Sequence, residues 1–164
     1  MKTGIMKTNT TTRVLNWLRC VGFVAGLLAA HGAMAQFSMV PAPLTQGAPR
    51  ASEAEMEKEY RIDAARHLYA AYPMRVFRGK MPPMLYSVMV VETEIDTAGQ
   101  VLNVNVVRKP AADEVAPWVV AMIKRAGPYP APTKLGTGTV HYLDIWLVDK
   151  SGLFQVDTLT EGQK

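Results

Sequence analysis

Two histidines, His67 and His141, lie outside the first 35 residues and are the first side chains to test for chemistry. His141 precedes Asp144 by three residues, so the two could form part of a nucleophilic triad. The serine would have to be one such as Ser87 or Ser151, but no G-x-S-x-G turn is present to expose a nucleophile. The histidines also lack H-x-x-x-H spacing and a cysteine to complete a zinc site. The sequence therefore predicts neither a catalytic centre nor a bound metal or cofactor.

Two acidic residues, Glu92 and Glu94, are the other candidates for acid–base chemistry. They lie on one face of a predicted strand, about 7 Å apart by strand geometry. A carboxylate pair acts as acid and base when a deep cleft separates the two pKa values. These two lie beside a predicted turn, which favours solvated charges at the end of a strand.

Residues 1–35 have the three parts of an export signal. Basic residues come first, the apolar run 21–30 follows, and Ala33-Met34-Ala35 has the small-x-small pattern of a cleavage site. We predict cleavage after Ala35 and a periplasmic protein. The apolar run has about half of the roughly 20 residues that a membrane helix needs. Retention as an inner-membrane anchor that faces the periplasm is the alternative.

Charge and cysteine content limit the function of the remaining chain. The whole chain has 18 basic and 14 acidic residues, and four basic ones but no acidic ones fall in 1–35, which leaves 14 against 14 in the remaining chain. A chain without excess positive charge is a poor candidate for binding nucleic acid. Cys20, the only cysteine, precedes the apolar run, so the sequence predicts neither lipidation nor a disulfide after cleavage.

A tether and a helix are predicted next. Residues 36–51 contain three prolines and no apolar periodicity, which indicates a short tether. Ser52 and Glu55 fit a capping box, so an amphipathic helix is predicted over 52–72, ending before Pro73. Its apolar stripe consists of Met56, Tyr60, Ala64, Leu68 and Ala71.

Alternating apolar residues and turn signals predict two hairpins around a second helix. Gly99 and Gly152 mark the two turns. The helix is expected to begin at a cap on Asp113 and to end at Gly127 in the left-handed conformation. The predicted strands are 85–95, 101–107, 139–148 and 153–159.

These elements predict an α+β fold, with a small antiparallel sheet in ββαββ order packed on one helix and preceded by the N-terminal helix. One strand face is expected beneath the Trp118 helix, with the members Met89, Val91, Val104, Val106, Leu143, Ile145 and Leu147. The other face is too apolar to remain wet, so the N-terminal helix, a second subunit or a partner should cover it. Its members are Tyr86, Val88, Val90, Tyr142 and Trp146.

The order and spacing of these motifs resemble the C-terminal domain of TonB-family proteins. The resemblance begins at the Tyr72-Pro73 pair and covers the predicted domain 73–160. The motifs that carry the resemblance are the D-x-x-G turn at Asp96 and Gly99, the strand 100–107, the helix, Pro128-Tyr129-Pro130 and the turn at Ser151-Gly152.

The resemblance implies a non-catalytic module that binds an extended peptide or a protein edge by β-strand addition along 139–148. The expected contacts are Val140, Tyr142, Asp144, Trp146 and Leu147, with Tyr142 and Trp146 as anchors. A second interpretation makes Trp146 a core residue under the N-terminal helix. The partner would be a periplasmic or outer-membrane protein segment, or a second copy of the chain.

Three features depart from the family's pattern. Residues 81–84 lack the glycine that members have before the first strand. The stretch 36–51, fully extended, reaches only about 50 Å, short of a transducer's spacer. Leu27 stands four residues before His31, where energy transducers have a serine. A membrane-anchored TonB-type transducer for outer-membrane transport is therefore the second hypothesis, and a small periplasmic hydrolase is the third.

Overall fold

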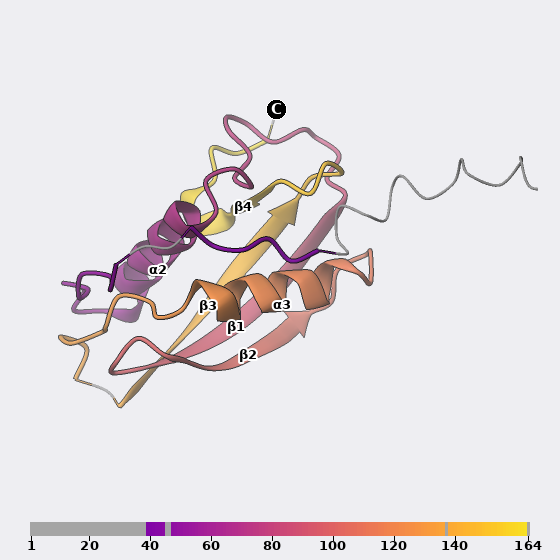
Figure 1. Cartoon of the computed structure of the whole chain (residues 1–164). Coiled ribbons are helices and arrows are strands. Elements are labelled where there is room, and N and C mark those ends of the chain that lie inside the picture. The colour runs from indigo at the N-terminus through magenta and orange to yellow at the C-terminus, as the bar shows by residue number, and fades with distance from the viewer. Residues whose placement is uncertain (1–38, 45–46, 137, 164) are drawn as a thin grey trace, which may run out of the picture. The chain divides into compact units, whose positions relative to one another are not determined.

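Two α-helices and four strands form the part of the chain described by the computed structural model, residues 39–44, 47–136 and 138–163 (Figure 1). The α+β class is confirmed, whereas the predicted export signal lies outside the described residues. In chain order the elements are α2 (Glu57–Ala71), β1 (Ser87–Asp96), β2 (Val101–Arg108), α3 (Val115–Ala126), β3 (Thr139–Val148), β4 (Phe154–Val156) and the short 3-10 helix η1 (Asp157–Leu159).

The four strands form one antiparallel sheet in the order β2-β1-β3-β4. The central pair, β1 and β3, is in regular register from Ser87 opposite Val148 to Asp96 opposite Thr139. The β1–β2 pair has two register shifts. β4 is much shorter than predicted and pairs with β3 only at Trp146, Leu147 and Val148. The sheet therefore has a long central pair and two unequal flanks.

The turn between β1 and β2 accounts for the predicted D-x-x-G motif. Gly99 has φ +82° and donates its N–H to the carbonyl of Asp96 at 3.0 Å, as a tight turn requires. A Cβ on Gly99 would lie 2.0 Å from the carbonyl oxygen of Tyr129, whose N–H donates to Gly99 at 2.7 Å. The first turn and the segment after α3 therefore pack backbone against backbone.

Helix α2 begins five residues later than predicted, which corrects the capping box. Met56 occupies the N-cap position, without a side-chain cap. The Ser52 hydroxyl instead donates to Asp63 at 2.7 Å and accepts from the N–H of Ala54 at 3.2 Å. Met56 was expected in the apolar stripe, but it is 58% exposed and precedes the helix. The buried positions of α2 are Tyr60, Ala64, Ala65, Leu68 and Ala71.

Helix α3 also differs at both ends from its predicted form. Glu114 rather than Asp113 is the N-cap, and its backbone is already helical. Gly127 has φ −62° and ψ 156°, so it is extended and not left-handed. The reason is Pro128, because the residue before a proline is restricted to extended conformations. Trp118 is 1% exposed, which confirms its place in the core.

Both helices pack on one face of the sheet (Figure 1). Tyr60 of α2 contacts Tyr142 of β3 edge-on, with ring centroids 5.9 Å apart, and Trp118 of α3 contacts Phe154 at 6.4 Å. The helices are joined by a hydrogen bond from the Tyr72 hydroxyl to the Met122 carbonyl, 3.0 Å long. The N-terminal helix therefore does not cover the second face, as one prediction had it, but shares the first face with α3.

The predicted faces of β3 are interchanged. Trp146 lies opposite Met89 and Asp144 opposite Val91, so the even-numbered residues of β3 face the helices. Leu143 and Ile145 lie on the other face, where they are 48% and 37% exposed. The sequence pattern was misleading because the odd-numbered and the even-numbered residues of β3 are both largely apolar, and the buried, even-numbered set includes Asp144.

The described part of the predicted tether lies against the domain. The N–H of Leu44 donates to the carbonyl of Ala71, the last residue of α2, at 2.8 Å. Arg125, near the end of α3, donates to the carbonyl of Val40 at 2.9 Å. Residues 40–44 thus follow the C-terminal ends of both helices, because these ends expose carbonyls and a basic side chain that an extended segment can satisfy.

Candidate functional site

The outer edge of β3 is the candidate site, because part of it has no neighbouring strand. The N–H of Asp149 donates to the carbonyl of Leu153 across the last turn, so the backbone of Asp149 points towards β4. Hydrogen-bonding direction alternates along a strand. The backbone groups of Thr139, His141 and Leu143 therefore also point outward, away from β1.

The two halves of β3 differ along this outer edge. We call residues 139–143 the open half, because among the described residues no strand pairing or backbone–backbone hydrogen bond joins its outward groups to another segment. We call residues 144–148 the closed half. There Leu147 pairs with Gln155 of β4, and the N–H of Ile145 donates to the side chain of Asp157 at 2.9 Å.

The outer side of β4 is itself covered. The N–H of Phe154 donates to the carbonyl of Arg75 at 2.8 Å, and the N–H of Phe77 donates back to Phe154 at 2.9 Å. The N–H of Val156 donates to the hydroxyl of Tyr69 at 3.0 Å. The closed half is therefore followed by a further layer of backbone, which leaves no free edge beyond β4 within the described residues.

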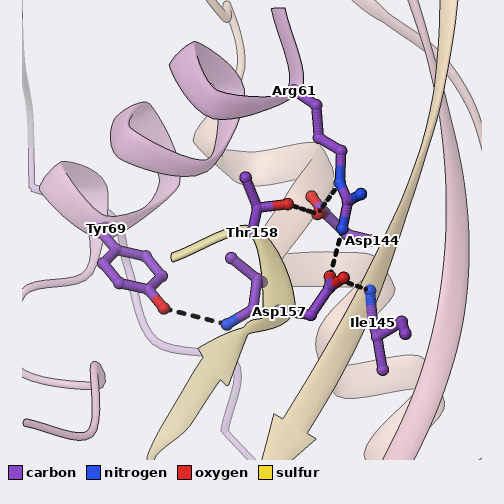
Figure 2. A network of polar contacts seen from close by, with 7 residues as sticks. Arg61, Tyr69, Asp144, Ile145, Asp157 and Thr158 are labelled. Atoms are coloured by element: carbon purple, nitrogen blue, oxygen red, sulfur yellow. Dashed lines mark hydrogen bonds and ion pairs between the residues drawn. The ribbon is translucent and has the colours of Figure 1, made fainter. Parts of the chain in front are cut away.

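A network of charged side chains holds η1 against the closed half (Figure 2). Arg61 of α2 donates from Nε to Asp144 at 2.8 Å and from its second terminal nitrogen to Asp157. The hydroxyl of Thr158 donates to the same oxygen of Asp144 at 2.7 Å. Three segments far apart in sequence thus meet at one buried carboxylate.

Burial governs the electrostatics of this network. It raises the pKa of the Asp144 carboxyl above its usual value, and the hydrogen bonds from Arg61 and Thr158 offset only part of the effect. Partial burial lowers the pKa of Arg61, but its hydrogen bonds to Asp157 and Asp144 outweigh this and the pKa is raised. The ion pair is therefore favourable for Arg61, while Asp144 bears the larger desolvation cost because it is the more deeply buried partner.

The predicted contact residues lie mostly in the interior. Val140, Tyr142, Asp144 and Trp146 are exposed by only 3%, 5%, 6% and 1%, and Leu147 is half-buried. Trp146 stacks on Phe154 with ring centroids 4.6 Å apart. This corrects the expectation that Tyr142 and Trp146 offer their side chains to a partner, and it supports the core interpretation of Trp146.

The exposed face next to the open half contains Val88 and Val90, as predicted for the second face, but its β3 side chains differ from those predicted. It carries aliphatic side chains from β1 and β3, with Leu143 and Ile145 the most exposed on β3. Its polar end has His141, whose Nε2 lies 3.6 Å from Glu94, and Glu92, which accepts from Asn105 at 3.4 Å. The strand register could have revealed this face, since residues opposite Val88 and Val90 must share it.

The side chains first tested for chemistry are separated in the structure. Ser87 lies opposite Val148, whereas His141 lies opposite Glu94, seven residues away along β1. That distance is about 23 Å at strand spacing, too far for a triad. His67 bonds to the carbonyl of Ala126 at 2.7 Å, in a role that joins α2 to α3. The described residues contain no cluster of histidine, cysteine or acidic side chains able to hold a metal.

The outer side of β2 is a second strand edge. β2 is the terminal strand of the sheet, and its register with β1 shifts near both of its ends. Leu102 and Val107, at these two shifts, are 53% and 56% exposed. Bulges of this kind twist an edge away from regular pairing and protect it from strand addition.

Comparisons with protein-family models, with curated proteins and with solved structures found no match for this chain. Among the residues described here, no helix combines the length and the apolar character needed to cross a bilayer.

Proposed function

We propose that this protein is a non-catalytic, exported binding module, similar to a TonB C-terminal domain, that accepts an extended peptide or a protein edge by β-strand addition. The open half of β3 is the binding site. The partner is a segment of a periplasmic or outer-membrane protein, and the protein itself acts in the periplasm after cleavage at Ala35.

One observation supports this proposal above the others. The outward backbone groups of Thr139, His141 and Leu143 lie in a regular strand whose inner side is fully paired with β1. These donors and acceptors have no partner among the described residues, and such a row is a template for another strand. Backbone recognition also fits the burial of Tyr142 and Trp146, because it needs no side-chain anchor from the sheet face that packs on the helices.

The side chains of an added strand would alternate between two environments. On the exposed face they would lie beside Leu143 and His141, which offer one apolar and one polar neighbour. We therefore expect a ligand with an apolar residue at the position beside Leu143, since cross-strand neighbours of this kind contribute to sheet stability.

A displayed library of random heptapeptides, selected against the purified protein, provides the test. The best peptide is synthesised and titrated while the backbone amides are followed by NMR. We expect the largest shifts at Thr139, His141 and Leu143. A matched peptide with N-methyl groups on the amides that face β3 should bind at least about tenfold more weakly, because each methyl removes a donor.

Two results would contradict the proposal. Shifts confined to Leu102 and Val107 would assign the site to β2, and equal affinity of the N-methylated peptide would exclude recognition through the backbone. The regular register of β3 and the shifted register of β2 are the reason that we expect neither.

The second candidate function is a membrane-anchored transducer of the same kind. It requires that the apolar segment 21–30 stays in the chain, and it uses the same edge of β3. Intact mass of the protein from its native cell separates the two: a chain that begins at Gln36 excludes the anchor, and an uncleaved chain in the membrane fraction supports it.

A further inference from the structure

Asp157 occupies the place that a strand would take beside Ile145. Its carboxylate accepts the N–H of Ile145 at 2.9 Å. Leu147, the next residue of β3 whose backbone faces this edge, is paired with Gln155 of β4. At this point the chain leaves the strand conformation and turns into η1. The side chain of Asp157 thus continues the role of the β4 backbone for one more residue.

The position of Asp157 is held from α2. Arg61 contacts both Asp157 and the buried Asp144, and Thr158, the residue after Asp157, donates to Asp144 at 2.7 Å (Figure 2). Asp144 is 6% exposed, and its neighbours in the network come from α2 and η1. A side chain fixed by contacts on two sides competes effectively with an incoming backbone carbonyl, because little conformational entropy is lost in keeping it there.

We propose that Asp157 is an intramolecular stop that sets the length of the strand-addition site at residues 139–143, and that Arg61 is the positioning residue that keeps it in place. The inference rests on the proposed function, since a stop has meaning only where a strand is added. The ligand it selects is a short extended segment whose pairing ends before Ile145.

Amide hydrogen exchange tests the stop without any ligand. In Asp157→Ala the N–H of Ile145 loses its acceptor and should exchange about tenfold faster or more, while the N–H of Leu147 keeps its partner and its rate. Asp113→Ala is the matched control, because Asp113 is exposed and lies just before α3. An Ile145 amide as slow as in the unaltered protein would overturn the proposal.

A second variant covers the case in which Asp157→Ala does not fold. Asp157→Asn keeps an oxygen at the same place but gives up the ion pair with Arg61, so we expect Ile145 to exchange faster than in the unaltered protein and more slowly than without any acceptor. Unchanged exchange at Ile145 in this variant would mean that the side-chain oxygen stays in place without the ion pair, which would overturn the assignment of Arg61 as the positioning residue.

Peptide length tests the consequence for binding. The probes are the heptapeptide selected against the unaltered protein and a version of it extended by two residues towards Ile145. In Asp157→Ala the extended peptide should bind about 3- to 10-fold more tightly than in the unaltered protein, the gain of about one backbone hydrogen bond, and the heptapeptide should be unaffected. Equal gains for both peptides would contradict a length-setting role.

Strand addition at the open half and the stop at Asp157 can each be disproved without the other. If selected peptides move no amide of the open half, the proposed function is wrong, whatever the exchange at Ile145. If peptides bind there but Ile145 exchanges at the same rate with and without the Asp157 carboxylate, strand addition holds and the stop is wrong.

Discussion

The two halves of β3 share one neighbour and differ in the other. Along its inner side the whole strand pairs with β1 in a single register. On the outer side the closed half contacts β4 and Asp157, and a further segment covers β4. The outward backbone groups of the open half have no partner among the described residues. The same local sequence pattern therefore occurs with a covered outer edge at one end of the strand and an open outer edge at the other.

What separates the two halves is long-range contact and not composition. Each half contains buried aromatic or aliphatic side chains on the helix face and exposed ones on the other face. The closed half is closed because a hairpin returns along it and because Arg61, 83 residues before Asp144, brings η1 alongside. Four predictions use this contrast.

The largest effect is expected in the closed half, at Trp146. Trp146→Ala removes a ring that is 1% exposed and stacked on Phe154, so the free energy of unfolding should fall by about 3 to 5 kcal/mol. Leu143→Ala in the open half, where the side chain is 48% exposed, should cost about 1 kcal/mol or less. Urea unfolding measures both, and similar losses would show that the halves do not differ in packing.

The next effect concerns the turn that supports the open end of the sheet. Gly99→Ala places a Cβ against the backbone of Tyr129 at a positive φ, so we expect a loss of about 2 to 4 kcal/mol. Gly79→Ala is the matched control, because Gly79 has φ +81° with nothing within 4 Å of the added Cβ. Its loss should stay near 1 kcal/mol, the cost of the left-handed conformation alone. Equal losses would rule out the close approach to Tyr129 as the cause.

A smaller effect is expected in the pH dependence of the closed half. The pKa of Asp144 is raised by burial, so between its unfolded and folded pKa values the folded protein holds a proton that the unfolded chain has released. The ionised carboxylate thus lowers stability at neutral pH, and this penalty is lost as the pH falls through the raised pKa. The unfolding free energy of the unaltered protein, relative to Asp144→Asn, should therefore rise as the pH is lowered from 7 towards 3.8, the usual value.

Other carboxylates are common to both proteins and cancel in that difference. A difference that stays constant would mean that the ion pair with Arg61 fully offsets the burial of Asp144, and one that falls with the pH would mean that the ion pair outweighs it. Urea unfolding at each pH supplies the comparison.

The last prediction concerns amide exchange in the unaltered protein and needs no mutation. In the unaltered protein the outward amides of His141 and Leu143 should exchange at least about tenfold faster than those of Ile145 and Leu147, because among the described residues only the latter two have acceptors. The amide of Tyr142, which points towards β1, is the internal control and should be slow. Slow exchange at His141 and Leu143 in a dilute sample would show that the open half is already covered.

Much of the element order could be predicted from local signals. The alternation over 139–148 and the glycine at 152 located β3 and its turn at the residues found, and the D-x-x-G pattern located the first hairpin. The helix ends were less predictable. Gly127 suits a left-handed cap by its own freedom, but Pro128 removes that option, and Ser52 prefers Asp63 to the helix backbone.

The candidate site was predictable as a strand and not as a surface. Tyr142 and Trp146 have the residue types of interface anchors, but the register with β1 turns both towards the helices. The burial of Asp144 was not predictable, because nothing nearby in sequence indicates that Arg61 and Thr158 will bind it. A carboxylate can be buried once partners are supplied, and those partners come from distant parts of the chain.

By itself, the sequence determined where strands, turns and helices form, because periodicity and turn residues act within a few positions of themselves. The tertiary structure alone decided that both helices share one face, which side chains of β3 are buried, and that β4 and Asp157 together close half of its outer edge. Those outcomes depend on which distant segments come into contact. The free energy of these contacts comes from pairs of residues far apart in sequence, which no local pattern contains.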